Sequence, residues 1–392
     1  MIGVLCPLLD FYPGYSVAGV VHTQLEILTR FEQDPLFITF GKLKGKCPCP
    51  HKSIPRWRHE EDWLEYAKRV QKQLDKALEG LSVVLVHDVF FVQGFEQVNM
   101  ALRVWIERNP GKIHWIIWSH SVPGPMPEDH ILSLDVPDST FIAITPQLVE
   151  PLCERYGITP DRVRVVRNPV CPKKTTLSDP ISQKIYNHFG LWQYDHVGVY
   201  PTRICSAKNV EAAVRLFSYL ENSILIVAGV WANCKESEDL IEKFKQIETE
   251  IKCGSTFVYT PELCPCYATG LPFETIQSLL HYSDIFVMPS LSESSSLITI
   301  EAALAKNLCI INSDVPALQD LLGENRTLQA SFGNLSKLGE ADLKELANRI
   351  HAVSEQNPIS VLHRHVRKNH DPNMIYLKEL SKLLTEFSTI LQ

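Results

Sequence analysis

The sequence has no run of about 18 consecutive apolar residues, so it predicts no helix that could span a membrane. It also lacks an excess of positive charge. Its 38 Lys and Arg residues are outnumbered by 45 Asp and Glu, and the net charge of −7 argues against general nucleic-acid binding. No basic residues precede the apolar N-terminus, so we expect a first strand there and not a signal peptide. With 45% apolar and 21% charged residues, the chain is expected to be a soluble globular protein.

Cysteine is present in an odd number, 11, and Cys6, Cys153, Cys205 and Cys309 lie in or beside predicted core elements. Free buried cysteines are common in reducing compartments, so we expect a cytoplasmic protein. Two C-x-C pairs stand apart, Cys47 with Cys49 and Cys264 with Cys266. Structural zinc sites usually use C-x2-4-C spacing. Loop thiols are therefore the favoured interpretation, and a metal site that bridges the pairs is the alternative.

The pattern of elements predicts two α/β domains. At 392 residues the chain is longer than one ordinary hydrophobic core supports. Strands and helices alternate along its whole length, which is typical of parallel sheets. Three prolines, Pro169, Pro172 and Pro180, mark the best boundary, so we place the first domain at 1–169.

Residues 284–306, DIFVMPSLSESSSLITIEAALAK, combine a strand, a polar loop and a helix. The apolar run 285–288 predicts a buried strand, and Pro289 ends it. The loop 290–296 is rich in residues that cap helix N-termini. In the helix that follows, apolar residues recur at helical spacing, and we expect this stripe to face the core: Leu297, Ile300 and Leu304.

Two carboxylates belong to this stretch. Glu301 lies within the apolar stripe, where an unpaired carboxylate would cost several kcal/mol. Glu293 lies eight residues earlier, in the loop at the carboxyl end of the strand, where parallel sheets bind ligands. We predict that both face one crevice and accept hydrogen bonds from the hydroxyls of a sugar or ribose. The alternative is a solvated Glu293 and a Glu301 paired with a structural cation.

Two cations lie in the loop after the predicted strand 196–200. Lys208 is placed at the positive end of the next helix, where a cation is disfavoured by about 0.3–1 kcal/mol. A bound anion would reverse that effect. Arg203 lies five residues earlier, so the two side chains could hold a diphosphate together. The alternative is an ordinary surface Arg and Lys.

Two histidines follow predicted strands in the first half. Strand 83–86 ends at His87, and strand 113–118 ends at His120, so both lie on the ligand-binding edge of the sheet. A histidine at such a place is often a hydrogen-bonded structural residue. His120 has the better case for function because the small-residue loop around Pro123 and Gly124 keeps its surroundings open.

Residues 42–58 are predicted to form a basic, proline-containing loop. Such a run is usually a solvated surface. Contact with an acidic acceptor, or peripheral contact with an anionic membrane surface, is the second interpretation.

The stretch 284–306 resembles the donor-site signature of retaining GT-B glycosyltransferases of the glycosyltransferase-4 type, in which seven residues separate two glutamates. The spacing of Arg203 and Lys208, and a strand that ends at Asn168 before the linker, resemble the same family. The resemblance covers nearly the whole chain and is strongest over 195–322. Ser294–Ser296 replaces the family's Gly-Phe-Gly type of loop, and Thr202 replaces the glycine before the arginine.

The resemblance implies two Rossmann-like domains with parallel sheets that face each other across a cleft. It implies an acceptor domain at 1–169, a nucleotide-sugar donor domain at 170–370, and a helix at 371–392 that returns to the first domain. The activity it implies is metal-independent hexosyl transfer, with retention, from a nucleoside diphosphate sugar to a glycan, glycolipid or small molecule.

The resemblance also implies roles for single residues. Arg203 and Lys208 would stabilise the leaving diphosphate, Glu301 would bind the ribose, and Glu293 would bind the transferred sugar. Backbone amides at Ser295, Ser296 and Leu297 would assist, His120 would contact the sugar from the facing domain, and Gly19 would approach the phosphates. No cofactor or metal is expected, because no Asp-x-Asp motif stands where metal-dependent glycosyltransferases would have one.

Two other functions stay open. A nucleotide-sugar epimerase or hydrolase of the same architecture would need extra carboxylates in the first domain, for which Asp10 and Asp88 are the candidates. A catalytically silent protein that binds a nucleotide sugar is the other alternative, and the Ser294–Ser296 substitution keeps it open.

Overall fold

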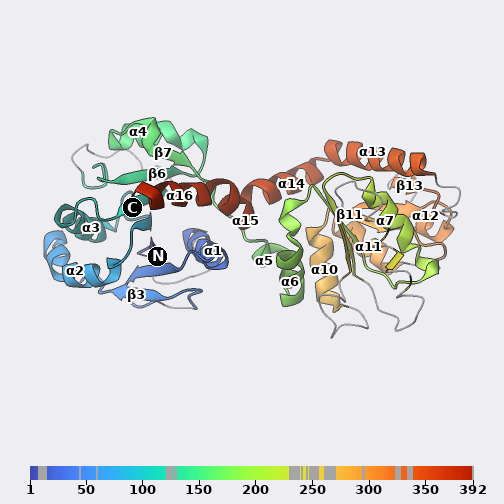
Figure 1. The fold of residues 1–392 in the computed structure, drawn as a ribbon, viewed down its shortest axis with the longest axis horizontal. Helices are drawn as coiled ribbons and strands as arrows, with labels where there is room; N and C mark the ends of the chain where they lie inside the picture. The colour runs from blue at the N-terminus through green and yellow to red at the C-terminus, as the bar shows by residue number, and fades with distance from the viewer. Residues whose placement is uncertain are drawn as a thin grey trace. The chain divides into compact units, whose positions relative to one another are not determined.

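The computed structural model describes residues 1–7, 16–43, 46–58, 61–120, 127, 130–228, 239, 242–243, 246, 256–259, 271–293, 296–322, 328–332 and 339–390. The chain divides into two compact units (Figure 1). Unit 1 comprises residues 1–170 and 369–392, and unit 2 comprises residues 171–368. Within the described ranges, no helix combines the length and apolarity that a bilayer crossing requires.

Unit 1 is built on a parallel sheet in the order β3-β2-β1-β4-β5-β6-β7. Its strands are β1 (Ile2–Leu5), β2 (Pro35–Phe40), β3 (His51–Ile54), β4 (Val83–His87), β5 (His114–Ser119), β6 (Ser139–Ala143) and β7 (Val163–Val165). Its helices are α1 (Ser16–Arg30), α2 (Trp63–Leu78), α3 (Glu96–Arg108), α4 (Val149–Tyr156), α15 (Pro372–Ile375) and α16 (Ser381–Ile390), with the π-helical turn η6 (Tyr376–Leu380) between the last two.

Each face of this sheet carries its own core. Because side chains alternate along a strand, Val84 and Val86 of β4 pack with α2 and α3, whereas Val83 and Leu85 pack on the other face. On that second face lie α1 and the C-terminal segment, with Phe387 of α16 buried in the same cluster. Figure 1 shows α16 lying among the elements of unit 1.

The prediction that residues 42–58 form a loop is wrong in part. The structure places strand β3 there, paired parallel with β2 from Phe37 opposite His51 to Phe40 opposite Ile54. Of the four residues of β3, only Ile54 is buried. An edge strand with a solvated face lacks the apolar run that reveals a central strand, and this explains the error.

Unit 2 is built on a second parallel sheet, in the order β10-β9-β8-β11-β12-β13. Its strands are β8 (His196–Tyr200), β9 (Ser223–Val227), β10 (Thr256–Tyr259), β11 (Ile285–Met288), β12 (Leu308–Asn312) and β13 (Leu328–Ala330). Its helices are α5 (Pro172–Thr175), α6 (Pro180–Phe189), α7 (Val210–Ser218), α10 (Phe273–Tyr282), α11 (Leu297–Leu304), α12 (Pro316–Leu322), α13 (Glu340–Gln356) and most of α14 (Pro358–His370). The predicted fold class, α/β with two parallel sheets, is confirmed.

Helix α7 packs so closely on β8 that the strand has a glycine beneath it. A Cβ atom at Gly198 would lie 2.1 Å from Cζ of Phe217. Phe217 is buried in the unit 2 core and cannot turn away without displacing its neighbours.

We therefore expect Gly198→Ala to lower the free energy of unfolding by about 1–3 kcal/mol, the usual cost of overpacking a core. Urea unfolding measures the loss. Gly19→Ala is the matched control, because a Cβ at Gly19 meets nothing within 4 Å and alanine favours the α1 helix. Equal stability of the parent and the Gly198 variant would show that α7 can move away from the sheet.

A buried ion pair ties α14 to the amino-terminal edge of the unit 2 sheet. Arg367 donates from Nη2 to Asp284 Oδ2 at 2.7 Å and from Nη1 to Oδ1 at 3.3 Å. The two side chains are 2% and 3% exposed. The backbone N–H of Val197 donates to the same carboxylate at 3.0 Å, and His363 Nδ1 lies 3.3 Å from Oδ1.

Burial alone would raise the pKa of the Asp284 carboxyl. The charge of Arg367 and the hydrogen bonds from His363 and Arg367 outweigh burial, so the pKa of Asp284 lies well below its usual value. The carboxylate is therefore charged across the physiological range, and its charge depends on the guanidinium beside it.

Candidate functional site

The order of the unit 2 strands reverses between β8 and β11, which are direct neighbours. In open parallel sheets, ligands bind outside the carboxyl ends of the strands at such a reversal, because the loops from the two strands diverge there. A pocket of about 650 Å³ lies at this place. It is lined by Pro201, Thr202, Arg203, Lys208, Ala228, Leu271, Phe273, Ile276, Met288, Glu293, Ser296, Leu297, Ile298 and Glu301.

The two loops that build the pocket are joined by hydrogen bonds. The backbone N–H of Leu291 donates to the carbonyl of Ala207 at 2.9 Å. Asn209 has a left-handed backbone, with φ of 49°, and ends the loop that carries the cations. Its amide donates to the carbonyls of Pro289 at 3.2 Å and Phe332 at 3.1 Å. Asn209 thus holds the loop after β8 against the loop after β11.

Lys208 and Glu293 form an ion pair inside the pocket, Nζ to Oε1. Their side chains are 20% and 11% exposed, so both are largely withdrawn from water. The hydroxyl of the buried Tyr200 donates to the backbone carbonyl of Lys208 at 2.7 Å. This bond fixes the backbone from which the lysine extends into the pocket.

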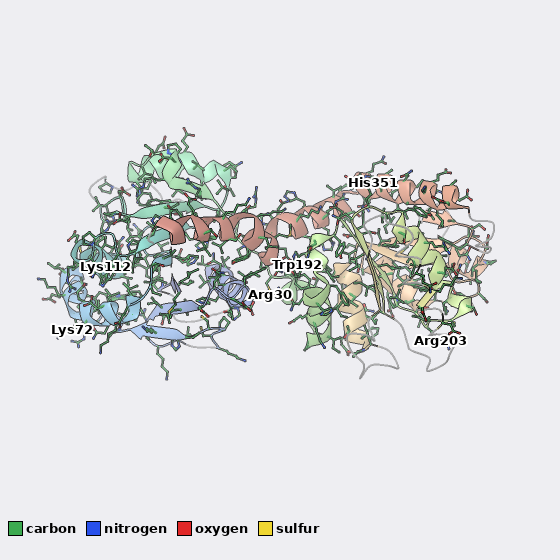
Figure 2. The ribbon with its side chains drawn as sticks, viewed as in Figure 1. Arg30, Lys72, Lys112, Trp192, Arg203 and His351 are labelled. Atoms are coloured by element: carbon green, nitrogen blue, oxygen red, sulfur yellow. The ribbon has the colours of Figure 1, made fainter. Side chains whose placement is uncertain are left out.

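The other two charged side chains of the pocket differ in their surroundings. Glu301 Oε2 accepts a hydrogen bond from Gln277 Nε2 of α10 at 2.8 Å. Arg203 is exposed, and Figure 2 labels it in unit 2. The two carboxylates balance the two cations, and an entering dianion would find an ammonium and a guanidinium to bind.

The expectation that Leu297, Ile300 and Leu304 face the core is wrong. They are 72%, 36% and 76% exposed, and the buried residues of α11 are Thr299 and Ala302. The helix is apolar on almost every side, so helical spacing does not single out the buried face. Small side chains at Thr299 and Ala302 let this short helix lie close to the sheet.

Because α11 turns Thr299 and Ala302 toward the sheet, Leu297 lines the pocket and Glu301 is half-buried beside it. Ser296 also lines the pocket, and its Oγ accepts a hydrogen bond from the Thr299 hydroxyl at 2.8 Å. Ser295 lies outside the described residues.

The two remaining predicted site residues belong to unit 1. Gly19 lies in the first turns of α1, with open space where a Cβ would be. His120 follows β5 and is hydrogen-bonded through both ring nitrogens, Nε2 to His87 Nδ1 at 3.0 Å and Nδ1 to the Asn168 amide at 3.4 Å. Burial lowers the pKa of His120 to about 4, so its imidazole is neutral at pH 7.

The sequence had not singled out Gln277, Asn209 or the contact between His87 and His120. Asn209 did carry a signal, since an asparagine directly before an apolar helix is typical of a helix start. Gln277 carried none, because its contact with Glu301 joins residues from two different helices.

The sulfurs of Cys47 and Cys49 lie 3.8 Å apart in unit 1. Burial, followed by the neighbouring Cys47, raises the pKa of the Cys49 thiol to about 12. Cys264 and Cys266 lie outside the described residues. Within the part of the chain that the structure describes, no three His, Cys, Asp or Glu residues gather as a metal site would require.

Together these observations define a protein of two parallel α/β units, one of which has a charged pocket at the reversal of its strand order. No family model matches the chain, and no curated protein matches it significantly. Among solved structures, it is similar to a glycosyltransferase from Rickettsia africae, at 16% identity and a TM-score of 0.39, over 100% of this chain and 98% of that one.

The chain is also similar to Anabaena Alr3699/HepE in complex with UDP, at 12% identity and a TM-score of 0.38, over 98% and 99% of the two chains. A third similar structure is sucrose-phosphate synthase from Thermosynechococcus elongatus, at 15% identity and a TM-score of 0.38, over 99% of both chains. Similarities of this size assign no family. The fold rests on the two parallel sheets described above.

Proposed function

We propose that this protein is a glycosyltransferase that transfers a hexosyl unit from a nucleoside diphosphate sugar to an acceptor, with retention at the anomeric carbon. One observation carries the proposal: Arg203, Lys208, Glu293 and Glu301, from two separate loop-helix segments, line a single pocket at the strand-order reversal. Two cations suit a diphosphate, and two carboxylates suit sugar hydroxyls.

Cleavage of the bond to the anomeric carbon leaves negative charge on the diphosphate. Arg203 and Lys208 would stabilise that charge as it develops, which lowers the barrier because the cations are already in place. The same two side chains supply the positive charge for which other enzymes use a metal ion. We therefore propose that the reaction needs no metal, so a chelator should leave the rate unchanged.

The carboxylates would hold the two ends of the donor. Glu301, already hydrogen-bonded to Gln277, would accept from the ribose hydroxyls. Glu293 would accept from hydroxyls of the transferred sugar once the diphosphate draws Lys208 away from it. The apolar side chains of Phe273, Ile276 and Leu297 offer a surface for a planar base.

The acceptor, in this proposal, binds to unit 1, with His120 and Gly19 at the carboxyl edge of that sheet. We also propose that the protein works in the cytoplasm, since cysteines that the structure describes, such as Cys153 and Cys309, are thiols outside any disulfide.

Mass spectrometry tests this function. The protein is incubated with UDP-, GDP- and ADP-hexoses, each in the presence of a mixture of glycan, glycolipid and small-molecule acceptors. We expect one donor to yield a product heavier than its acceptor by one hexosyl unit, together with the free nucleoside diphosphate. Proton NMR of the product should show the anomeric configuration of the donor.

Each alternative gives a different outcome. Release of free sugar, or a change in the donor without any acceptor, would indicate a hydrolase or an epimerase. Binding of a donor with no product under any acceptor would indicate a silent binding protein. An inverted anomeric centre would overturn the retaining mechanism while leaving glycosyl transfer in place.

A further inference from the structure

A chain of four polar side chains runs along the carboxyl edge of the unit 1 sheet, from Trp118 through Asn168 and His120 to His87. The indole Nε1 of Trp118 donates to Asn168 Oδ1 at 3.1 Å. An indole N–H can only donate, so the oxygen of the Asn168 amide must face Trp118. The orientation of that amide is thereby assigned by its partner, and its nitrogen faces His120.

The Asn168 amide determines which nitrogen of the His120 imidazole carries the proton. Asn168 Nδ2 lies 3.4 Å from His120 Nδ1, and an amide nitrogen only donates, so Nδ1 must accept. A neutral imidazole that accepts at Nδ1 carries its proton on Nε2. That proton points at His87 Nδ1, which is 3.0 Å from His120 Nε2.

The tautomer of His120 in turn determines the tautomer of His87. His87 accepts at Nδ1, so its own proton is on Nε2, a buried nitrogen that meets no hydrogen-bond partner among the described residues. Burial, followed by the nearby His120, lowers the pKa of His87 far below its usual value, so the ring does not charge. Three rings are stacked here: His87 lies with its centroid 5.3 Å from that of His120 and 5.7 Å from that of Trp118.

We propose that His87 and Asn168 are positioning residues for His120. Asn168 selects the tautomer with the proton on Nε2, and His87 holds the ring by accepting that proton. This proposal rests on the proposed function, in which His120 lies where the acceptor binds to unit 1. When a substrate hydroxyl replaces His87 as acceptor, His120 presents a donor N–H that is already in the correct tautomer, so no proton has to move.

Nitrogen NMR of the full-length protein labelled with 15N-histidine tests the proposal without any substrate. A His120→Gln spectrum identifies the His120 signals among the 14 histidines. At pH 7 we expect an unprotonated Nδ1 and a protonated Nε2, whose proton is protected from exchange with water. A protonated Nδ1 in the parent protein would overturn the proposal.

Variants separate the two roles. Asn168→Asp replaces the donating amide with an acceptor, so Nδ1 of His120 should become protonated; an unchanged tautomer would contradict the assignment. His87→Phe removes the acceptor, so the Nε2 proton of His120 should lose its protection from exchange with water. His87→Gln, which offers an amide oxygen as acceptor, should restore that protection. If it does not, His87 does not have its proposed role.

His114→Phe is the matched control. His114 belongs to the same sheet, is hydrogen-bonded to the Thr140 hydroxyl at 3.0 Å and stacks on Phe387, so its partners differ from those of His120. It should leave the His120 signals in place. If His87→Phe does not fold, the Asn168→Asp spectrum still decides the tautomer. The expected spectra in a protein that transfers no sugar would refute the proposed function alone.

Discussion

Lys208→Ala is expected to lower turnover by about 100- to 1000-fold, the usual effect of removing one group that stabilises charge in a transition state. The physical reason is the loss of one of two cations in the pocket that would face the leaving diphosphate. The substitution also leaves Glu293, only 11% exposed, without its ion-pair partner, so the remaining carboxylate repels the donor. Steady-state kinetics with the identified donor measures the effect.

Stability should change less, by about 1–3 kcal/mol, because the substitution leaves a largely buried carboxylate without its partner while some water still reaches it. Lys344→Ala is the matched control: this lysine is also paired with a glutamate, Glu340, but on α13 and away from the pocket. Adding Glu293→Gln to Lys208→Ala should restore stability without restoring turnover. Equal turnover in the Lys208 variant and the parent would remove Lys208 from the mechanism.

Arg367→Met is expected to cost about 3–5 kcal/mol of stability, because it leaves the carboxylate of Asp284 buried without a countercharge. In a unit of this size each kcal/mol lowers the melting temperature by roughly 2–4 °C, so calorimetry should detect a large shift. The double variant Asp284→Asn with Arg367→Met should recover much of the loss, since it removes both charges and keeps an acceptor for Val197.

The pH dependence of this loss has a definite sign. The pKa of Asp284 is depressed in the folded parent, so the contribution of its charge is complete above the unfolded pKa, about 3.9. It is lost as the pH falls below that value toward the folded pKa. In Arg367→Met the buried carboxyl protonates readily, so the difference from the parent should shrink in acid. A difference that stays constant from pH 7 to pH 3 would contradict the assignment.

The central strands of unit 2 could be predicted from the sequence with almost no error. The apolar run 285–288 is bounded by Asp284 and Pro289, and the structure gives β11 those limits. Buried parallel strands are recognisable because both of their faces are apolar. The places of the pocket residues followed from one further rule, that parallel sheets bind ligands at the carboxyl ends of their strands.

The features that the sequence could not supply depend on contacts between distant segments. The ion pair of Lys208 with Glu293 joins residues 85 positions apart, and the Asn209 amide reaches Phe332 across 123 positions. The buried face of α11 was mistaken because Leu297 and Leu304 are as apolar as the residues that pack on the sheet. Strand β3 was missed because an edge strand needs only one partner and one apolar side chain.

The proposed donor site makes one central claim, that the pocket between the β8 and β11 loops binds a nucleoside diphosphate. Thermal unfolding of the parent and of the double variant Arg203→Ala with Lys208→Ala is followed with UDP, GDP, ADP and their hexose derivatives. At 100 times its dissociation constant, a ligand of the folded state adds about 2.7 kcal/mol of stability. We expect such a shift for at least one nucleotide in the parent and its loss in the double variant. No shift with any of them, or the same shift in both proteins, would contradict it.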